Sequence, residues 1–272
     1  MSAGCASYDG LGAGQSYSNL ETVRRAETAG SKPQVARRRF TGRRGRRPVT
    51  SSGLGSLDAM KLACIVSAPF AENSYVAHLE GRKDSLVVDP GLEPGRILEY
   101  LDDNGLTPAA ILNTHGHADH IAGNAAMKQR WPHCPLVIGR LEAPKLSDPV
   151  SNLSAMFDLP LISPPADVLV DDGQWYRAAG FELEVRLIPG HSSGHVVFVW
   201  LAHQPPHVFG GDVLFAGGVG RTDFPDGSFQ QLAAGIRGKL FTLPDETVVL
   251  PGHGPATTIG IEKRTNPFVG ER

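Results

Sequence analysis

The sequence has little of several features that would define other classes of protein. Three cysteines in 272 residues (Cys5, Cys64 and Cys134) are odd in number and widely spaced, which argues against a disulfide framework. The longest apolar run, VVFVWLA, is far shorter than the roughly 20 residues of a membrane-spanning helix, so no membrane partner is expected. There is no repeat of fixed period and no heptad array, which argues against a solenoid or a coiled coil.

Positive charge is concentrated at the start of the chain. Residues 1–60 carry ten Lys/Arg and four Asp/Glu, whereas residues 61–272 carry sixteen and twenty-four. The first part includes RRRFTGRRGRRPV and has no sustained apolar periodicity, so residues 1–59 are predicted to be a disordered transit peptide, for a chloroplast in preference to a mitochondrion. The alternatives are a basic arm that touches nucleic acid, or an upstream extension of a cytoplasmic protein whose translation starts at Met60.

The remainder, residues 60–272, is predicted to be one α/β domain. Short apolar stretches typical of strands include KLACIVS, SLVVDP, AAILN, HVVFVW and TVVL. Helix-like stretches lie between them: RILEYLDDNG, AAMKQRW and SFQQLAAGIRGKLF. The acidic balance of this part opposes a phosphate-tracking surface, so no nucleic-acid partner is expected.

The stretch THGHADH, residues 114–120, follows the expected strand AAILN. Side chains at i and i+2 of an extended segment lie on one side, so His115 and His117 can converge on one cation. Asp119 and His120 follow as the chain turns into a helix, which aims them toward a second cation. A helix-capping role accounts for the aspartate alone but leaves three histidines unexplained.

Further candidate ligands stand at the ends of other expected strands. PGHSSGH contains His191, GGDVLF contains Asp212, and PGHG contains His253. A single loop histidine is more often a surface residue than a ligand. The combination with THGHADH is much more specific, and it predicts a two-metal site.

These motifs together resemble the signature of the metallo-β-lactamase fold, and GDVLFAGGVGRTDFPDGS and PGHGPATTIGIEKRTNPF resemble its glyoxalase II-like (hydroxyacylglutathione hydrolase-like) branch. The resemblance implies a four-layer αββα sandwich. It also implies that one metal binds His115, His117 and His191, that a second binds Asp119, His120 and His253, and that Asp212 bridges them. Asp89 and His195 take positions that support the ligands.

The resemblance implies a hydrolase for a small-molecule thioester such as S-lactoylglutathione, with a hydroxide bridging two divalent metals and with Asp119 and Asp212 as catalytic carboxylates. Nitrogen and oxygen ligands without a thiolate suit zinc, and also iron or manganese. Arg221 matches a position that contacts glutathione in that branch, whereas Asp223 and Pro255 stand where it has tyrosines.

Four other functions stay open. A mononuclear iron persulfide dioxygenase would use His115, His191 and Asp212. A lactonase or another ester hydrolase would use the same metals. A nuclease of the same fold is suggested only by the basic arm, and a non-catalytic metal-binding protein would need only four closed ligands.

Overall fold

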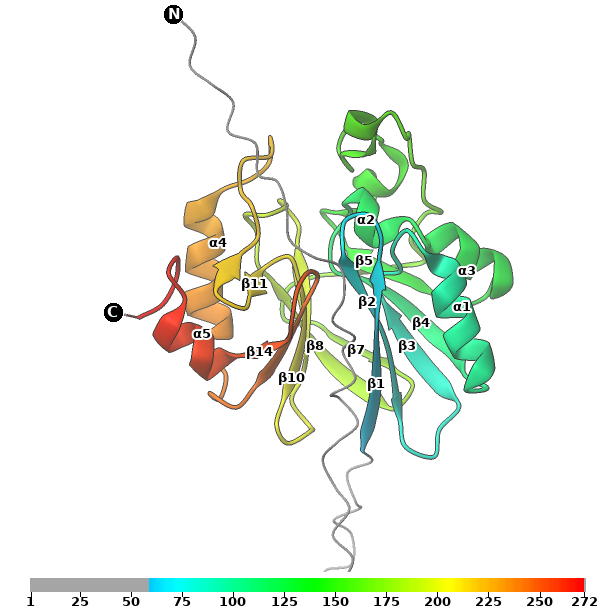
Figure 1. Ribbon diagram of the computed structural model, residues 1–272, viewed down its shortest axis with the longest axis horizontal. Coiled ribbons are helices and arrows are strands. Elements are labelled where there is room, and N and C mark those ends of the chain that lie inside the picture. The colour runs from blue at the N-terminus through cyan, green and yellow to red at the C-terminus, as the bar shows by residue number, and fades with distance from the viewer. Residues whose placement is uncertain (1–58, 272) are drawn as a thin grey trace, which may run out of the picture. The chain divides into compact units, whose positions relative to one another are not determined.

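The computed structural model describes residues 59–271. The predicted transit peptide of residues 1–59 therefore lies, apart from residue 59, outside the described residues, and the domain boundary at residue 60 stays a prediction. The described residues contain two six-stranded mixed sheets that lie face to face (Figure 1). No helix among residues 59–271 is long and apolar enough to cross a membrane.

The first sheet has its strands in chain order. They are β1 (Met60–Ser67), β2 (Glu72–Leu79), β3 (Asp84–Val88), β4 (Thr107–Asn113), β5 (Leu136–Gly139) and β6 (Val168–Val170). The first three are antiparallel, and β3 to β6 run parallel to one another. The carboxyl ends of these parallel strands therefore share one edge of the sheet, where ligands commonly bind in α/β folds.

The second sheet has the order β14-β13-β10-β9-β8-β7. Its strands are β7 (Trp175–Ala178), β8 (Phe181–Leu187), β9 (Val196–Trp200), β10 (His207–Gly211), β13 (Val248–Pro251) and β14 (Thr257–Thr258). The pair β10 and β13 is parallel, so these two strands also end at one edge. A small hairpin of β11 (Leu214–Phe215) and β12 (Gly218–Val219) follows β10.

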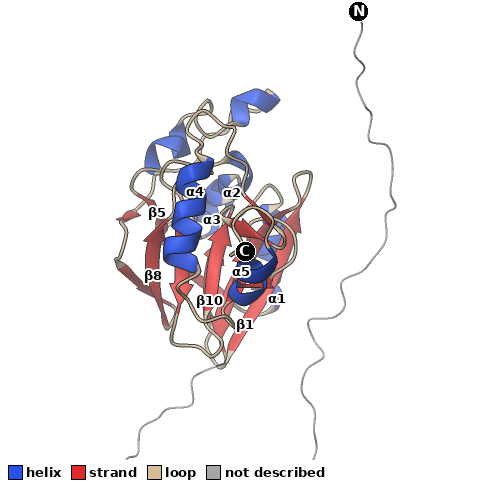
Figure 2. Ribbon diagram, turned by 90° about the vertical axis from the view of Figure 1, so that its left-hand side faces the viewer, coloured by secondary structure: helices blue, strands red, loops and turns tan. Residues whose placement is uncertain are grey.

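Helices cover the outer face of each sheet. On the first sheet these are α1 (Pro94–Asp103) and α3 (Asn124–Arg130), with the short α2 (Ala118–Ile121) beside the sheet edge (Figure 1). On the second they are α4 (Phe229–Gly235), which continues as a π-helix η3 (Ile236–Leu240), and α5 (Ile259–Thr265), as Figure 2 shows. Two 3₁₀ turns, η1 (Ala143–Ser147) and η2 (Ser154–Phe157), follow β5.

The two sheets and the helices outside them form four layers, and three apolar cores hold these layers together. The central one lies between the sheets and joins Leu86 and Val88 of the first to Phe198 and Phe209 of the second. Another packs the first sheet against α1 and α3, and the third packs the second sheet against α4, η3 and α5. Each core removes a large apolar area from water, which is the main term that stabilises such a fold. The predicted αββα sandwich is confirmed.

Candidate metal centre

The seven residues predicted as metal ligands come together at one edge of the sandwich. His115 and His117 follow β4, and Asp119 and His120 lie in α2. The other three follow strands of the second sheet: His191 comes after β8, Asp212 after β10 and His253 after β13. Both sheets therefore contribute ligands, because β4, β8, β10 and β13 all end at the same edge of the sandwich.

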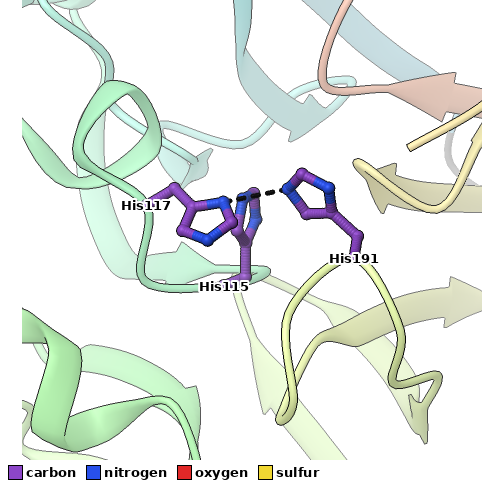
Figure 3. Close-up of side chains that lie close together, drawn as sticks. All are labelled: His115, His117 and His191. Atoms are coloured by element: carbon purple, nitrogen blue, oxygen red, sulfur yellow. Dashed lines mark hydrogen bonds between the residues drawn. The ribbon is translucent and has the colours of Figure 1, made fainter. Parts of the chain in front are cut away.

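His115, His117 and His191 form the first candidate group. Their ligand nitrogens all lie within 4.8 Å of one another, and all three side chains are buried. His117 Nδ1 lies 2.9 Å from His191 Nε2, and Figure 3 shows the three rings facing one space. A single cation with bonds of roughly 2 Å to imidazole nitrogens fits a group of this size.

Asp119, His120 and His253 form the second candidate group, again with ligand atoms within 4.8 Å of one another. Asp119 Oδ2 lies 3.3 Å from His253 Nε2 and 3.7 Å from His120 Nε2. The short helix α2 holds Asp119 and His120 on consecutive residues, and the loop after β13 brings His253 to them from the other sheet.

Asp212 lies between the two groups. Its Oδ2 is 3.5 Å from His191 Nε2 of the first group and 3.5 Å from His253 Nε2 of the second, and its Oδ1 is 3.5 Å from His120 Nε2. A Cβ atom on Gly252 would stand 2.2 Å from Asp212 Oδ1, so only glycine leaves room for this carboxylate. Asp212 therefore lies within reach of both ligand groups, and its role as a bridging ligand stays a prediction.

Four side-chain atoms of the candidate ligand residues are buried without a hydrogen-bond partner among the described residues: His115 Nε2, His117 Nε2, His120 Nε2 and Asp212 Oδ1. Leaving a buried polar atom unpaired costs about 1–3 kcal/mol, so four in one cluster require a common partner. Neutral imidazole nitrogens and a carboxylate oxygen are all metal ligands. The residues present therefore fit two metal ions.

The protonation of His115 and His117 agrees with that fit. Burial lowers the pKa of His115 well below its usual range, and the nearby His120 and His117 lower it further. Burial likewise lowers the pKa of His117. Both rings are therefore neutral at pH 7, the form that binds a metal. For His120, burial lowers the pKa, but the carboxylates of Asp119 and Asp212 outweigh it and raise the pKa above its usual range.

Asp89 contacts the loop that carries His115 and His117. Its carboxylate accepts hydrogen bonds from Thr114 N at 2.7 Å and Thr114 Oγ1 at 2.6 Å, and it lies 3.2 Å from His120 Nδ1. Its own backbone has φ of 46°, a strained value for a non-glycine residue, which persists only where surrounding contacts enforce it. A carboxylate behind a ligating imidazole fixes the ring orientation and the tautomer.

His195 supports Asp212. Its Nε2 accepts a hydrogen bond from Asp212 N at 3.0 Å, and its ring stacks on His115 with centroids 4.6 Å apart. Gly211 has φ of 47°, and a Cβ there would stand 2.7 Å from His195 Nε2. The close approach of β10 to this histidine therefore depends on a glycine.

Two residues that the sequence motifs did not indicate hold the ligand loops in place. Glu142, fully buried, accepts hydrogen bonds from Gly116 N at 2.8 Å and Gly194 N at 2.7 Å. It thereby ties the His115–His117 loop to the His191 loop. Asn73 donates to Pro251 O at 2.9 Å and Gly254 O at 2.8 Å, and so anchors the loop that carries His253.

A cavity of about 400 Å³ opens over both ligand groups. Five of the ligands line it, together with Arg221, whose backbone carbonyl accepts a hydrogen bond from His191 Nδ1 at 2.8 Å. The rest of the wall is mostly apolar and consists of Phe70, Ala118, Asn152, Leu153, Phe157, Phe215, Val219 and Phe224.

Comparisons with known proteins agree with this site. Residues 68–253 match the family model of the metallo-beta-lactamase superfamily. The chain is 37% identical over 216 residues to hydroxyacylglutathione hydrolase GloC of Haemophilus influenzae, covering 78% of this chain and 100% of that protein. It is also similar to the solved structure of the B3 metallo-beta-lactamase BLEG-1, with TM-score 0.74, 35% identity and coverage of 78% and 100%.

A second solved structure bears on the metals. The chain is similar to TTHA1623 in a di-iron-bound form, with TM-score 0.67, 36% identity and coverage of 76% of this chain and 99% of that one. The fold, the matched family and the paired ligand groups lead to one identification: the chain belongs to the metallo-β-lactamase superfamily. Its histidine-rich site is that of a metallo-hydrolase.

Proposed function

We propose that this chain hydrolyses a thioester, with S-lactoylglutathione as the first substrate to test. The similarity to GloC, which extends over the whole of that hydroxyacylglutathione hydrolase, supports this reaction. So does the presence of two ligand groups joined by one carboxylate, since paired cations favour hydrolytic attack on a carbonyl.

The observation that carries the proposal is that the two ligand groups, joined by Asp212, open onto one cavity. Among the described residues that line the cavity there is no lysine, tyrosine, cysteine or serine that would protonate a departing atom. An amine leaving an amide needs such a proton, whereas a thiolate leaves readily without one. Hydrolysis of a thioester therefore requires no further acid in this cavity.

The metals, when bound, supply Lewis acidity toward the carbonyl and lower the pKa of the attacking water. The chain's own residues position the ligand groups and accept the proton of the attacking water. Asp119 lines the cavity, and although burial opposes it, His120 and His253 hold the pKa of its carboxyl below the ordinary value. Asp119 is thus an ionised acceptor for the proton of the attacking water. Asp212 holds the two ligand groups at a fixed separation.

The test is hydrolysis of S-lactoylglutathione by the purified full-length chain loaded with zinc, iron or manganese in parallel. We expect turnover that depends on the metal and falls on the order of 100-fold or more in Asp119→Asn, because the proton acceptor is lost. A protein with both sites loaded and no thioester turnover would contradict the proposal.

The alternative functions differ from this one in the substrate turned over and in the metal bound. Oxygen uptake with a persulfide and a single iron per chain would indicate a dioxygenase. Turnover of lactones or oxygen esters in preference to any thioester would indicate a different hydrolase. Full metal loading with no activity on any of these would indicate a metal-binding protein.

A further inference from the structure

Aromatic side chains form much of the wall beside the ligand groups. Phe70, from the β1–β2 turn, and Phe157 of η2 lie with ring centroids 5.1 Å apart, and both are well exposed, at 39% and 52%. Phe224 lies against the His117 ring with centroids 5.2 Å apart, and Phe215 lies near His253. Exposed aromatic surface of this extent favours a ligand with apolar groups close to the reacting carbonyl.

The positive side chain in the cavity wall is paired with a carboxylate of the chain itself. Among the described residues that line the cavity, Arg221 is the one lysine or arginine. Its Nε and Nη2 donate to the two carboxylate oxygens of Asp223 at 2.7 and 2.6 Å, and its guanidinium stacks over Phe224 at 4.3 Å. This is the bidentate geometry in which an arginine would otherwise bind a substrate carboxylate.

The pair persists over the physiological pH range. The hydrogen bonds from Arg221 lower the pKa of Asp223 to about 2, so its carboxylate stays ionised at neutral pH. Both side chains are exposed, at 61% and 67%, so their interaction is weak in free energy and easily altered by substitution. A carboxylate on the substrate must displace Asp223 to reach Arg221.

We infer that the enzyme favours thioesters of uncharged thiols with apolar acyl groups over glutathione thioesters, and that Asp223 sets this preference by occupying Arg221. The inference rests on the proposed thioesterase function. Water adds to the carbonyl carbon, the C–S bond breaks with its electron pair on sulfur, and the products are a carboxylic acid and a thiol. Arg221 and Asp223 take no part in these steps and act only on the thiol portion.

The experiment compares two substrates with the same acyl group, S-lactoylglutathione and S-lactoyl-N-acetylcysteamine, whose thiol portion is neutral. Wild-type holoenzyme should have the higher kcat/KM for the neutral thioester. In Asp223→Asn the freed Arg221 should raise kcat/KM for S-lactoylglutathione on the order of 2- to 5-fold, the range expected of one exposed ion pair, mainly through KM. In the same variant, kcat/KM for S-lactoyl-N-acetylcysteamine should stay unchanged.

A matched control is Asp171→Asn. Asp171 forms the same bidentate pair with Arg140, at 2.9 and 2.7 Å, outside the cavity. The Asp171→Asn substitution should leave kcat/KM unchanged for both substrates.

A substitution in the aromatic wall of the cavity tests the preference for apolar acyl groups. Phe157→Ala should lower kcat/KM for S-hexanoyl-N-acetylcysteamine several-fold more than for the S-acetyl compound, because the longer acyl chain has more apolar surface to bury against the ring. Equal losses on the two compounds would contradict the acyl preference.

Two outcomes separate this inference from the proposed function. A wild-type preference for S-lactoylglutathione, with Asp223→Asn leaving the ratio of the two substrates unchanged, would overturn the inference while the thioesterase function stood. No turnover of either thioester by the metal-loaded protein would overturn the proposed function and the inference with it.

Discussion

Glu142 provides a test of how the ligand loops are held. Its Oε1 accepts hydrogen bonds from Gly194 N and from Ser192 Oγ, and its Oε2 accepts one from Gly116 N and lies 3.4 Å from Lys145 Nζ. One buried carboxylate therefore joins the loop of His115 and His117 to the loop of His191. The Glu142→Gln substitution replaces one of these acceptor oxygens with an amide donor.

The expected magnitude follows from these contacts. In Glu142→Gln at least one backbone N–H that donates to the carboxylate loses its acceptor, and the buried Lys145 loses part of its neutralising charge. A hydrogen bond to a charged group contributes about 1.5–3 kcal/mol, so the free energy of unfolding should fall by about 2–3 kcal/mol. Residues that orient ligands typically alter metal affinity by about 10- to 100-fold, and we expect a loss in that range.

The assay is metal titration against a competing chelator, with unfolding of the metal-free protein in urea measured alongside. Glu142 contacts the loops of the first ligand group, so the affinity of one metal should fall while the second metal, held by Asp119, His120 and His253, is affected less. The control Glu182→Gln removes the charge of an exposed pair with Arg177 and should change neither quantity. Unchanged metal affinity in Glu142→Gln would refute the reasoning.

Three other substitutions test separate parts of the structure. Gly252→Ala places a Cβ against Asp212 and should reduce metal content below two per chain, whereas Gly95→Ala, with open space at its Cβ, should not; equal metal content in both would contradict the steric argument. Burial lowers the pKa of His207 to about 4, below its unfolded value near 6.5. The unfolded chain therefore binds the extra proton, and stability is lost as the pH falls from 6.5 to 4. His207→Phe should remove about 1–2 kcal/mol of that loss after allowance for partial exposure, as measured by urea unfolding at several pH values; identical pH profiles would contradict this. Asn73→Ala removes two hydrogen bonds to the His253 loop and should weaken binding of the second metal in a chelator titration; an unchanged affinity would contradict a role of Asn73 in holding that loop.

Local sequence patterns predicted the ligands because their spacing carries the chemistry. His115 and His117 alternate on an extended segment, and Asp119 and His120 follow directly on a helical turn, so four ligands are placed by neighbouring residues alone. His191, Asp212 and His253 each follow a strand, and the resemblance assigned them to the same site. The structure brings all seven together.

The supporting residues could not be predicted in the same way. Glu142 contacts residues 26 and 52 positions away in the sequence, and Asn73 contacts residues 178 and 181 positions away. Such contacts depend on how the two sheets pack, which no local pattern contains. Glu142 lies beside a four-residue strand and looks like an ordinary surface charge in the sequence.

The elements were predicted better than their ends. The stretch SFQQLAAGIRGKLF was predicted as one helix, and the structure has an α-helix to Gly235 that continues as a π-helix to Leu240. Helical periodicity predicts a buried face but not a change of hydrogen-bond pattern along it. The pairing of Arg221 with Asp223 was likewise not predicted, although the two residues are only two positions apart.

The proposed hydrolysis requires both ligand groups and Asp212, which lies between them. The most direct measurement is metal stoichiometry together with S-lactoylglutathione turnover, in the wild-type chain and in Asp212→Ala. We expect about two metals per chain with turnover in the wild type, and a loss of turnover on the order of 100-fold or more in the variant, with the fold retained. Full turnover in Asp212→Ala, or one metal per chain in an active wild type, would contradict this requirement.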